Sequence, residues 1–353
     1  MEETPSDDRD FFSSMQLACG SVLPMALKTA IQLNLLHLIT QSPGGSISAS
    51  DLAGKLPKTN PAAGKMIDRI LCLLAAHDVV VCRVVASPRG GFERLYSKGP
   101  AAKLLTENEG GISLAPMSIL IQDIAYFNAW HHLKDAIVEG GEAFHRAHGM
   151  SLFDYQATDK EYSKVFNGAM LAHTKIFMNK LLQTYTGLEG LKSLVDVGGG
   201  VGVTLKMIIE KYPSIQGINF DLPHVIDQAL PFPGIEHVAG DMFVSVPKAD
   251  AIFLKYICHD WSDEQCKKLL RNCYDALGDD GKVIIVDSIM FEEPNVTSDF
   301  KYMATMDVLM MVVSPGGIER TEGEFNDIFR DTGFKKSQKV CYVYGMWIIE
   351  LHK

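Results

Sequence analysis

Four glycines in five positions follow a short apolar run in the segment SLVDVGGGVG, residues 193–202. Glycine has no Cβ, so its backbone can adopt conformations closed to other residues and can lie close to a bound ligand. A dinucleotide site has the pattern G-x-G-x-x-G, but the spacing here is G-x-G-x-G, and Val203 stands where the third glycine would be. The turn therefore indicates a cofactor site and counts against, without excluding, a pyrophosphate site.

Two acidic residues end the strand-like runs that follow this turn. Asp221 closes GINFD about twenty residues after Gly200, where a carboxylate can accept both hydroxyls of a ribose. Asp241 is followed by Met242, and an acid beside an apolar thioether suits the edge and the face of an adenine. We expect Asp196, just before the glycines, to organise the turn. This order predicts a nucleoside cofactor without phosphates, and S-adenosyl-L-methionine fits that description.

A histidine follows the fourth apolar run, in AIFLKYICHDW. A phenol has a pKa of about 10, so at neutral pH it attacks a methyl group poorly unless a base takes its proton. His259, with an ordinary pKa of about 6.5, suits that role. Its ring would need a carboxylate to fix the tautomer. Asp287 in VIIVDS and Glu319 in SPGGIERT are the candidates.

The same acidic residues leave a metal site as an alternative. His259, Asp260, Asp241 and Asp287 could instead form a divalent-metal site, since hard cations prefer the oxygen ligands that the three carboxylates offer. The aromatic neighbours Tyr256 and Trp261 suit an aromatic acceptor better than a hydrated ion. We therefore predict no metal.

Strands and helices alternate from about Leu194 onward. Helix-length segments separate the apolar runs LVDVGGG, GINFDLP, HVAGDMF, AIFLKYI and KVIIVDSIM. This alternation predicts βαβ units and a mainly parallel sheet with helices on both faces. Ligands bind such sheets at the carboxyl ends of the strands, so the glycines, the acids and His259 should meet at one edge. The last segment, VCYVYGMWIIELHK, predicts a closing hairpin about Gly345.

The first half of the chain is mainly helical. Apolar residues at helical period predict a helix over 23–39. Ser48, with Asp51 three residues later, predicts a second helix start, and Asn60 before Pro61 predicts a third. VVVCRVVASPRGGFERLY predicts a hairpin that turns at Pro-Arg-Gly-Gly. Three helices followed by a hairpin are typical of a winged helix.

Composition narrows the class of protein. A chain of 353 residues predicts two domains, and 47% hydrophobic with 22% charged residues is typical of a globular protein. The net charge of −10 disfavours nucleic acid or an anionic membrane as a partner. No apolar run reaches the roughly 20 residues of a membrane span. The N-terminus is acidic, unlike a signal peptide. The seven cysteines form no C-x-x-C pair, which indicates a reducing compartment.

Longer motifs along nearly the whole chain resemble plant small-molecule O-methyltransferases of the caffeic acid O-methyltransferase type. They are MQLACGSVLPMALKTAIQL, AWHHLKDAIVEGG, LVDVGGGVG, GINFDLPHVI, EHVAGDMFVSVPKADAIFLKYICHDWSDEQC, NCYDAL and PGGIERTEGEF. The resemblance implies a cytoplasmic homodimer. Its winged-helix-like N-terminal domain dimerises, and its Rossmann-like class I methyltransferase domain binds S-adenosyl-L-methionine. It also implies the domain ranges 1–110 for dimerisation, 111–160 for a helical connection that contributes to the acceptor pocket, and 161–353 for methyl transfer.

The resemblance assigns roles position by position. His259 matches the general base, and Asp287 and Glu319 match the two acids that flank it. The cofactor residues that it implies are Gly198, Asp221, Asp241, Met242 and Lys255. No metal is needed in the family.

This sequence departs from the caffeic acid pattern at several positions. Asp287 stands where those enzymes have Glu, and Tyr256 replaces a Trp. Ile121 and Ser314 each stand where an Asn is expected. The acceptor pocket that we expect is therefore more apolar than a monolignol site, and its residues are Leu120, Ile121, Phe153, Phe166, Met170, Met310, Met311 and Ser314. The loss of a hydrogen bond there can change discrimination between acceptors tenfold or more.

These observations predict methyl transfer from S-adenosyl-L-methionine to a phenolic hydroxyl of a plant specialised metabolite: a phenylpropanoid, coumarin, flavonoid or benzylisoquinoline alkaloid. N-methylation of an aromatic amine such as anthranilate is the alternative, followed by a nicotinamide dehydrogenase. A ligand-sensing winged-helix regulator that binds DNA is more distant. Its recognition helix would carry only Lys65 and Arg69, opposed by Asp68.

Overall fold

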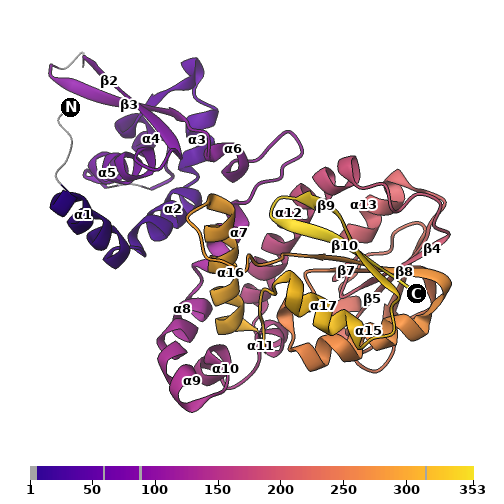
Figure 1. Cartoon of the computed structure of the whole chain (residues 1–353). Helices are drawn as coiled ribbons and strands as arrows, with labels where there is room; N and C mark the ends of the chain where they lie inside the picture. Colours follow the sequence, from indigo (N-terminus) through magenta and orange to yellow (C-terminus); the bar gives the residue numbers. More distant parts are fainter. Residues whose placement is uncertain (1–5, 59, 87–89, 315) are drawn as a thin grey trace. The chain divides into compact units, whose positions relative to one another are not determined.

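The computed structural model describes residues 6–58, 60–86, 90–314 and 316–353, which form two compact units (Figure 1). The first unit runs to Asp123 and also includes 165–173. The second comprises 124–164 and 174–353, so helix α12 (Lys160–Thr184) contributes to both. The expected boundaries near 110 and 160 stay a prediction.

The first unit packs short helices around a small antiparallel sheet of order β1-β3-β2. Its elements are α1 (Ser6–Ala18), α2 (Val22–Gln32), α3 (Leu35–Thr40), η1 (Pro43–Gly45), β1 (Ile47–Ser48), α4 (Ala49–Gly54), α5 (Ala63–Ala75), β2 (Val80–Ala86), β3 (Phe92–Lys98), α6 (Ala102–Leu105) and α7 (Ala115–Ile121). Its core includes Leu35, Leu52 and Leu71, all fully buried. The predicted hairpin is confirmed as β2 and β3, with Val80 opposite Lys98, while part of its turn, 87–89, lies outside the described residues.

Local sequence patterns in this unit predicted some helix boundaries correctly and others wrongly. Ser48 caps α4, because its hydroxyl accepts from the backbone N–H of Asp51 at 3.1 Å, as predicted. The helix expected over 23–39 is wrong as one element: Asn34, at φ 57°, breaks it into α2 and α3. Helix α5 begins at Ala63 rather than at Pro61, and the Asn60 side chain accepts from the N–H of Ala62.

The second unit contains a seven-stranded sheet of order β6-β5-β4-β7-β8-β10-β9. The strands are β4 (Ser193–Val197), β5 (Gln216–Asp221), β6 (Ile235–Ala239), β7 (Ala249–Lys255), β8 (Leu277–Asp287), β9 (Lys336–Val343) and β10 (Met346–His352). The first five are parallel and the last two antiparallel, as predicted. The chain turns through Tyr344, at φ 47°, and Gly345, at φ 89°, between β9 and β10, which confirms the closing hairpin.

Helices cover both faces of this sheet (Figure 1). Side chains alternate along a strand: on β7, Ile252 and Leu254 face one core, while Ala251 and Phe253 face the other. Residues of α15 and α17 fill the first core, and residues of α12 and α13 fill the second. The remaining elements are α8 (Ile124–His131), α9 (Leu133–Glu139), α10 (Ala143–His148), α11 (Leu152–Thr158), α13 (Val203–Lys211), α14 (Pro223–Ile226), η2 (Cys258–Asp260), α15 (Asp263–Ala276), α16 (Ser298–Val313) and α17 (Glu322–Arg330).

Strand order reverses at β4. The chain adds β5 and β6 on one side of β4 and then crosses to place β7 on its other side. Such a switch point is where open α/β sheets bind ligands, at the carboxyl ends of the strands. The glycines after β4 and His259 after β7 both lie at this edge, since the two strands are parallel neighbours.

Candidate active site

The glycine turn, residues 198–202, connects β4 to α13. Gly198, Gly200 and Gly202 have φ angles of 67°, 59° and 85°, in the left-handed region that favours glycine. The peptide N–H of Gly200 donates to the carboxylate of Asp221 at 2.8 Å. Asp221, which we predicted to bind the cofactor ribose, therefore contacts the turn that follows β4.

Most of these glycines also make room for the protein's own side chains. A Cβ on Gly198 would lie 2.4 Å from the Ile257 side chain, and one on Gly199 would lie 2.2 Å from Asn219 Oδ1. At Gly200 a Cβ would meet nothing within 4 Å. From the sequence we expected glycines because a ligand must lie close to the backbone. The close packing beneath the turn is a second reason, and the open side at Gly200 is where a ligand can approach.

Asp196 on β4 is buried, and the half-buried Lys255 on the neighbouring strand β7 affects its ionisation. Burial raises the pKa of Asp196 and lowers the pKa of Lys255, and the opposite charge of each partner offsets part of the shift. Lys255 Nζ donates to Thr174 Oγ1 at 3.2 Å. Asp196 Oδ2 is buried and has no hydrogen-bond partner among the described residues. An acceptor oxygen beside an open backbone fits a ligand with N–H or O–H donors, such as the ribose and the amino-acid tail of S-adenosyl-L-methionine.

The adenine-binding residues that we predict follow β6. Asp241 Oδ1 accepts from the backbone N–H of Phe243 at 2.8 Å, which fixes the start of this loop. Met242 packs against the core formed by α15 and α17, and its carbonyl accepts from Asn272 at 2.8 Å. Both residues therefore have a defined position in the second unit.

The histidine turn, residues 256–261, follows β7. His259 lies on η2 with its side chain 12% exposed, and its Nδ1 is 2.9 Å from Glu319 Oε1. Glu319 is itself held: Ser288 donates to its other oxygen, and its backbone N–H donates to Asp307 at 2.9 Å. An ionised Glu319 accepts from Nδ1–H, which leaves Nε2 as the nitrogen that can take a proton.

The second predicted acid is placed differently. Asp287 Oδ2 accepts from the backbone N–H of Cys258 at 3.1 Å, so this carboxylate holds the turn that carries His259. Burial raises the pKa of Asp287 to about 7, although the charge of His259 opposes the shift. Of the two acids, the structure brings Glu319 to the imidazole ring.

Three carboxylates set the ionisation of His259. Burial lowers its pKa, but the negative charges of Asp260 and Glu319, with a smaller contribution from Asp287, outweigh burial and raise the pKa to about 10. Nε2 lies 3.8 Å from Asp260 Oδ1. The raised pKa matches that of a phenol, about 10, so a neutral His259 can take a phenolic proton at little cost. At neutral pH most of the imidazole is protonated, and the fraction that can act as a base grows as the pH rises.

Arg320 is a residue that sequence reasoning missed. Its side chain is fully buried, and it donates to the carbonyls of Cys258 at 2.7 Å and Trp261 at 2.6 Å and to Asp263 at 2.9 Å. These bonds hold the backbone of the histidine turn on both sides of His259. Its place directly after Glu319 was the available signal, because a buried arginine must find several acceptors.

The predicted acceptor residues fall in both units. Leu120, Ile121, Phe166 and Met170 belong to the first unit, and the other four belong to the second. Phe153 stacks on Trp261 with ring centroids 5.9 Å apart, at the end of the histidine turn. Met310 is half-buried and Met311 is exposed near the end of α16.

Ser314 is buried beside this turn. Its hydroxyl donates to Asp260 Oδ1 at 3.0 Å. The hydroxyl therefore has a partner within the protein, whereas we expected it to face the acceptor. Pro315, in the same motif, lies outside the described residues. The assignment of the acceptor pocket stays a prediction.

Metal sites and membrane-spanning helices are two other features that the described residues could contain. In the part of the chain that the structure describes, no group of three or more His, Cys, Asp or Glu side chains is arranged to hold a metal ion. No helix within those residues is long and apolar enough to cross a membrane.

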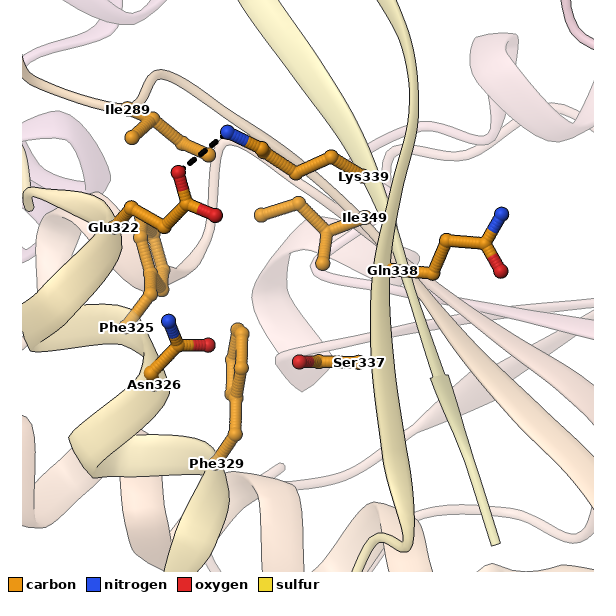
Figure 2. Close-up of a pocket in the computed structure, with 9 residues that line it drawn as sticks. All are labelled: Ile289, Glu322, Phe325, Asn326, Phe329, Ser337, Gln338, Lys339 and Ile349. Carbon is orange, nitrogen blue, oxygen red and sulfur yellow. Dashed lines mark hydrogen bonds and ion pairs between the residues drawn. The ribbon is translucent and has the colours of Figure 1, made fainter.

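A small cavity of about 50 Å³ lies between α17 and the β9–β10 hairpin (Figure 2). An ion pair between Glu322 and Lys339 crosses it, above Phe325, Phe329 and Ile349. It contains none of the predicted site residues and is too small for an aromatic acceptor.

The chain is similar to known proteins along nearly its whole length. The O-methyltransferase domain model matches residues 130–335, and the O-methyltransferase dimerisation domain model matches residues 15–108. The chain is 53% identical to caffeic acid 3-O-methyltransferase 1 of Ocimum basilicum, with 98% of this chain and 96% of the relative covered. It is 55% identical to flavonoid 3'-O-methyltransferase 3 of Mentha piperita, covering 97% and 94%, and 52% identical to esculetin O-methyltransferase of Kitagawia praeruptora, covering 96% and 94%.

Solved structures show the same fold. Human N-acetylserotonin methyltransferase in complex with its methyl donor superposes with a TM-score of 0.82 at 21% identity, with 99% of each chain covered. The fold and site define a class I methyltransferase with an N-terminal dimerisation domain. The chain belongs to the O-methyltransferase family and is an S-adenosyl-L-methionine-dependent O-methyltransferase. The resemblance, fold class and cofactor predicted from the sequence are confirmed.

Proposed function

We propose that this enzyme methylates a phenolic hydroxyl of a plant specialised metabolite, with His259 as the general base. The observation that carries the proposal is the 2.9 Å contact between His259 Nδ1 and Glu319, which orients the ring beside the glycine turn's edge of the sheet. The names of its relatives support the acceptor class, since they act on caffeic acid, a flavonoid and esculetin. We therefore expect a phenylpropanoid, coumarin, flavonoid or benzylisoquinoline alkaloid.

The cofactor, when bound, supplies a methyl group already activated by a sulfonium charge. The residues that would hold it are Gly198, Asp221, Asp241, Met242 and Lys255. At the acceptor, His259 Nε2 would take the phenolic proton, and Glu319 would stabilise the imidazolium that forms. The protein otherwise contributes alignment and the exclusion of water.

The test is methyl transfer from labelled S-adenosyl-L-methionine to a panel of catechols, coumarins, flavonoids, alkaloids and anthranilate, with and without EDTA. We expect EDTA-resistant labelling of a phenol. Labelling of anthranilate alone would favour the competing N-methylation. Loss of labelling in EDTA would assign His259 and its neighbouring acids to a metal instead of to base catalysis.

We also propose that the enzyme is a cytoplasmic homodimer. The dimerisation-domain match supports the dimer, and Phe11, Phe12 and Leu17 on α1 are 61%, 54% and 83% exposed, which suits a covered apolar face. The seven cysteines are free, as expected in a reducing compartment. Light scattering should give twice the monomer mass.

A gel shift at low salt should show no DNA binding, because Asp68 on α5 pairs with Arg94 at 2.7 Å and the chain is acidic.

A further inference from the structure

A polar pair next to the glycine turn has no role in the account above. Asn219 on β5 is fully buried, and His237 on β6 is half-buried. The register of the parallel strands places the two residues opposite each other. The Asn219 amide nitrogen lies 3.1 Å from His237 Nδ1 and 2.9 Å from the carbonyl oxygen of Gly200. The pair therefore connects β5 and β6 to the glycine turn that follows β4.

The direction of each hydrogen bond follows from its fixed partner. The carbonyl of Gly200 can only accept, so the nitrogen of the Asn219 amide must face it. That nitrogen can only donate, so His237 Nδ1 must accept. His237 Nε2 lies 2.9 Å from the carbonyl oxygen of Leu230, which also can only accept. The three bonds thus require the neutral Nε2–H tautomer of His237 and one orientation of the Asn219 amide.

The same amide shapes the glycine turn. Asn219 and Asp221 are two positions apart on β5, so their side chains point to the same side of the sheet. Asn219 donates to the carbonyl of Gly200, while Asp221 accepts from its N–H at 2.8 Å, so the two hold Gly200 through both of its backbone groups. Space for Asn219 and His237 also requires glycine: a Cβ on Gly199 would lie 2.2 Å from Asn219 Oδ1, and one on Gly202 would lie 3.0 Å from the His237 ring.

We propose that Asn219, oriented by His237, is a positioning residue that fixes the glycine turn for cofactor binding. The inference rests on the proposed assignment of this turn to the cofactor. A turn that is already ordered costs less to bind than one that must be ordered by the ligand. Loss of the pair should therefore weaken cofactor affinity while the rate at saturating cofactor stays close to wild type.

Two substitutions of His237 separate positioning from bulk packing. His237→Asn places an amide oxygen near the position of Nδ1, so it keeps the acceptor for Asn219 and loses the bond to Leu230. His237→Gln places its amide near Nε2, so it keeps the bond to Leu230 and loses that acceptor. Asn219→Leu has a similar shape and donates nothing. Thr332→Val is the matched control, because it removes a buried hydroxyl bonded to the Phe329 carbonyl at 2.7 Å at the end of α17.

The measurement is calorimetric binding of S-adenosyl-L-homocysteine to each full-length variant, with hydrogen exchange at residues 198–202 in the free protein. A lost buried hydrogen bond predicts about a tenfold higher Kd for His237→Gln and Asn219→Leu, with faster exchange. His237→Asn should stay within about threefold of wild type, and Thr332→Val should change only the melting temperature.

Equal weakening by both His237 substitutions, or unchanged Kd in His237→Gln and Asn219→Leu, would overturn the proposal. Asp241→Ala, a direct cofactor residue in our assignment, shows which idea has failed. If it alone weakens binding, the cofactor binds at this edge of the sheet and the positioning role of Asn219 is wrong. If it also leaves the Kd unchanged, the proposed cofactor site is wrong.

Discussion

The glycine turn and the histidine turn occupy equivalent places after neighbouring parallel strands, but they are built in different ways. The glycine turn contributes backbone: three left-handed glycines, held at Gly200 by side chains from β5. The histidine turn contributes a side chain, and Glu319, Asp287 and Arg320 hold it from other parts of the chain. The first depends on glycines that are adjacent in the sequence and on two side chains of β5. The second is a set of charges that only the tertiary structure assembles.

The comparison predicts that the two turns fail separately. Damage to the histidine turn should lower kcat and leave cofactor affinity intact, and damage to the glycine turn should do the reverse.

The largest effect should come from His259→Ala. Without the base, the phenolic proton loses the acceptor that we assign to it, and kcat should fall by about 10³-fold or more. Binding of S-adenosyl-L-homocysteine, followed by calorimetry, should remain within about twofold of wild type, since no cofactor residue is altered. A variant with wild-type turnover would show that His259 is not the base.

Glu319→Gln should have the next largest effect. The amide cannot stabilise the imidazolium as a carboxylate does, and kcat should fall by about 10²-fold. Asp287→Asn is the matched control, because Asp287 contacts the Cys258 N–H rather than the ring, and it should lower kcat less. If Asp287→Asn were the more damaging of the two, the acid that orients His259 would have been assigned wrongly.

Gly202→Ala should affect the other turn. Its φ of 85° and the His237 ring 3.0 Å from the added Cβ both oppose a side chain. The Kd for S-adenosyl-L-homocysteine should rise by about tenfold, with kcat at saturating cofactor nearly unchanged. Gly278→Ala, where a Cβ meets nothing within 4 Å, provides the control. An equal fall in kcat would mean that the two turns are not independent.

Ser314→Ala should have the smallest effect. Its hydroxyl holds Asp260, which lies 3.8 Å from His259 Nε2, so its loss should lower kcat by only a few-fold. Steady-state kinetics with a single phenolic acceptor would detect this. A large rise in acceptor KM with unchanged kcat would instead favour the acceptor contact that we predicted from the sequence.

The sequence predicted the parts of this molecule that depend on neighbours in the chain. The short apolar runs of the parallel strands, the Ser48 cap and the Gly345 hairpin are local patterns, and each is present in the structure. The break at Asn34 was not predicted, because apolar residues continue at helical period across it. A left-handed residue there changes direction without changing the pattern.

The site was predicted only as a set of candidates. The sequence named two acids for His259 but could not say which would reach the ring, since Glu319 lies 60 residues away in the chain. It gave no role to Arg320, and none to Asn219 or His237, whose hydrogen bonds depend on strand register and burial. Such pairings are set by the tertiary structure, so residue type alone does not reveal them.

The measurement that tests the central claim most directly is the pH dependence of kcat/KM for a phenolic acceptor, in wild type and His259→Ala. The pKa of His259 is raised to about 10, so below that pH its imidazole carries a proton and cannot act as a base. The wild-type rate should therefore rise with pH through this range, above any rise that His259→Ala retains from ionisation of the acceptor itself. The same profile and rate in both proteins would contradict the assignment of His259 as the general base.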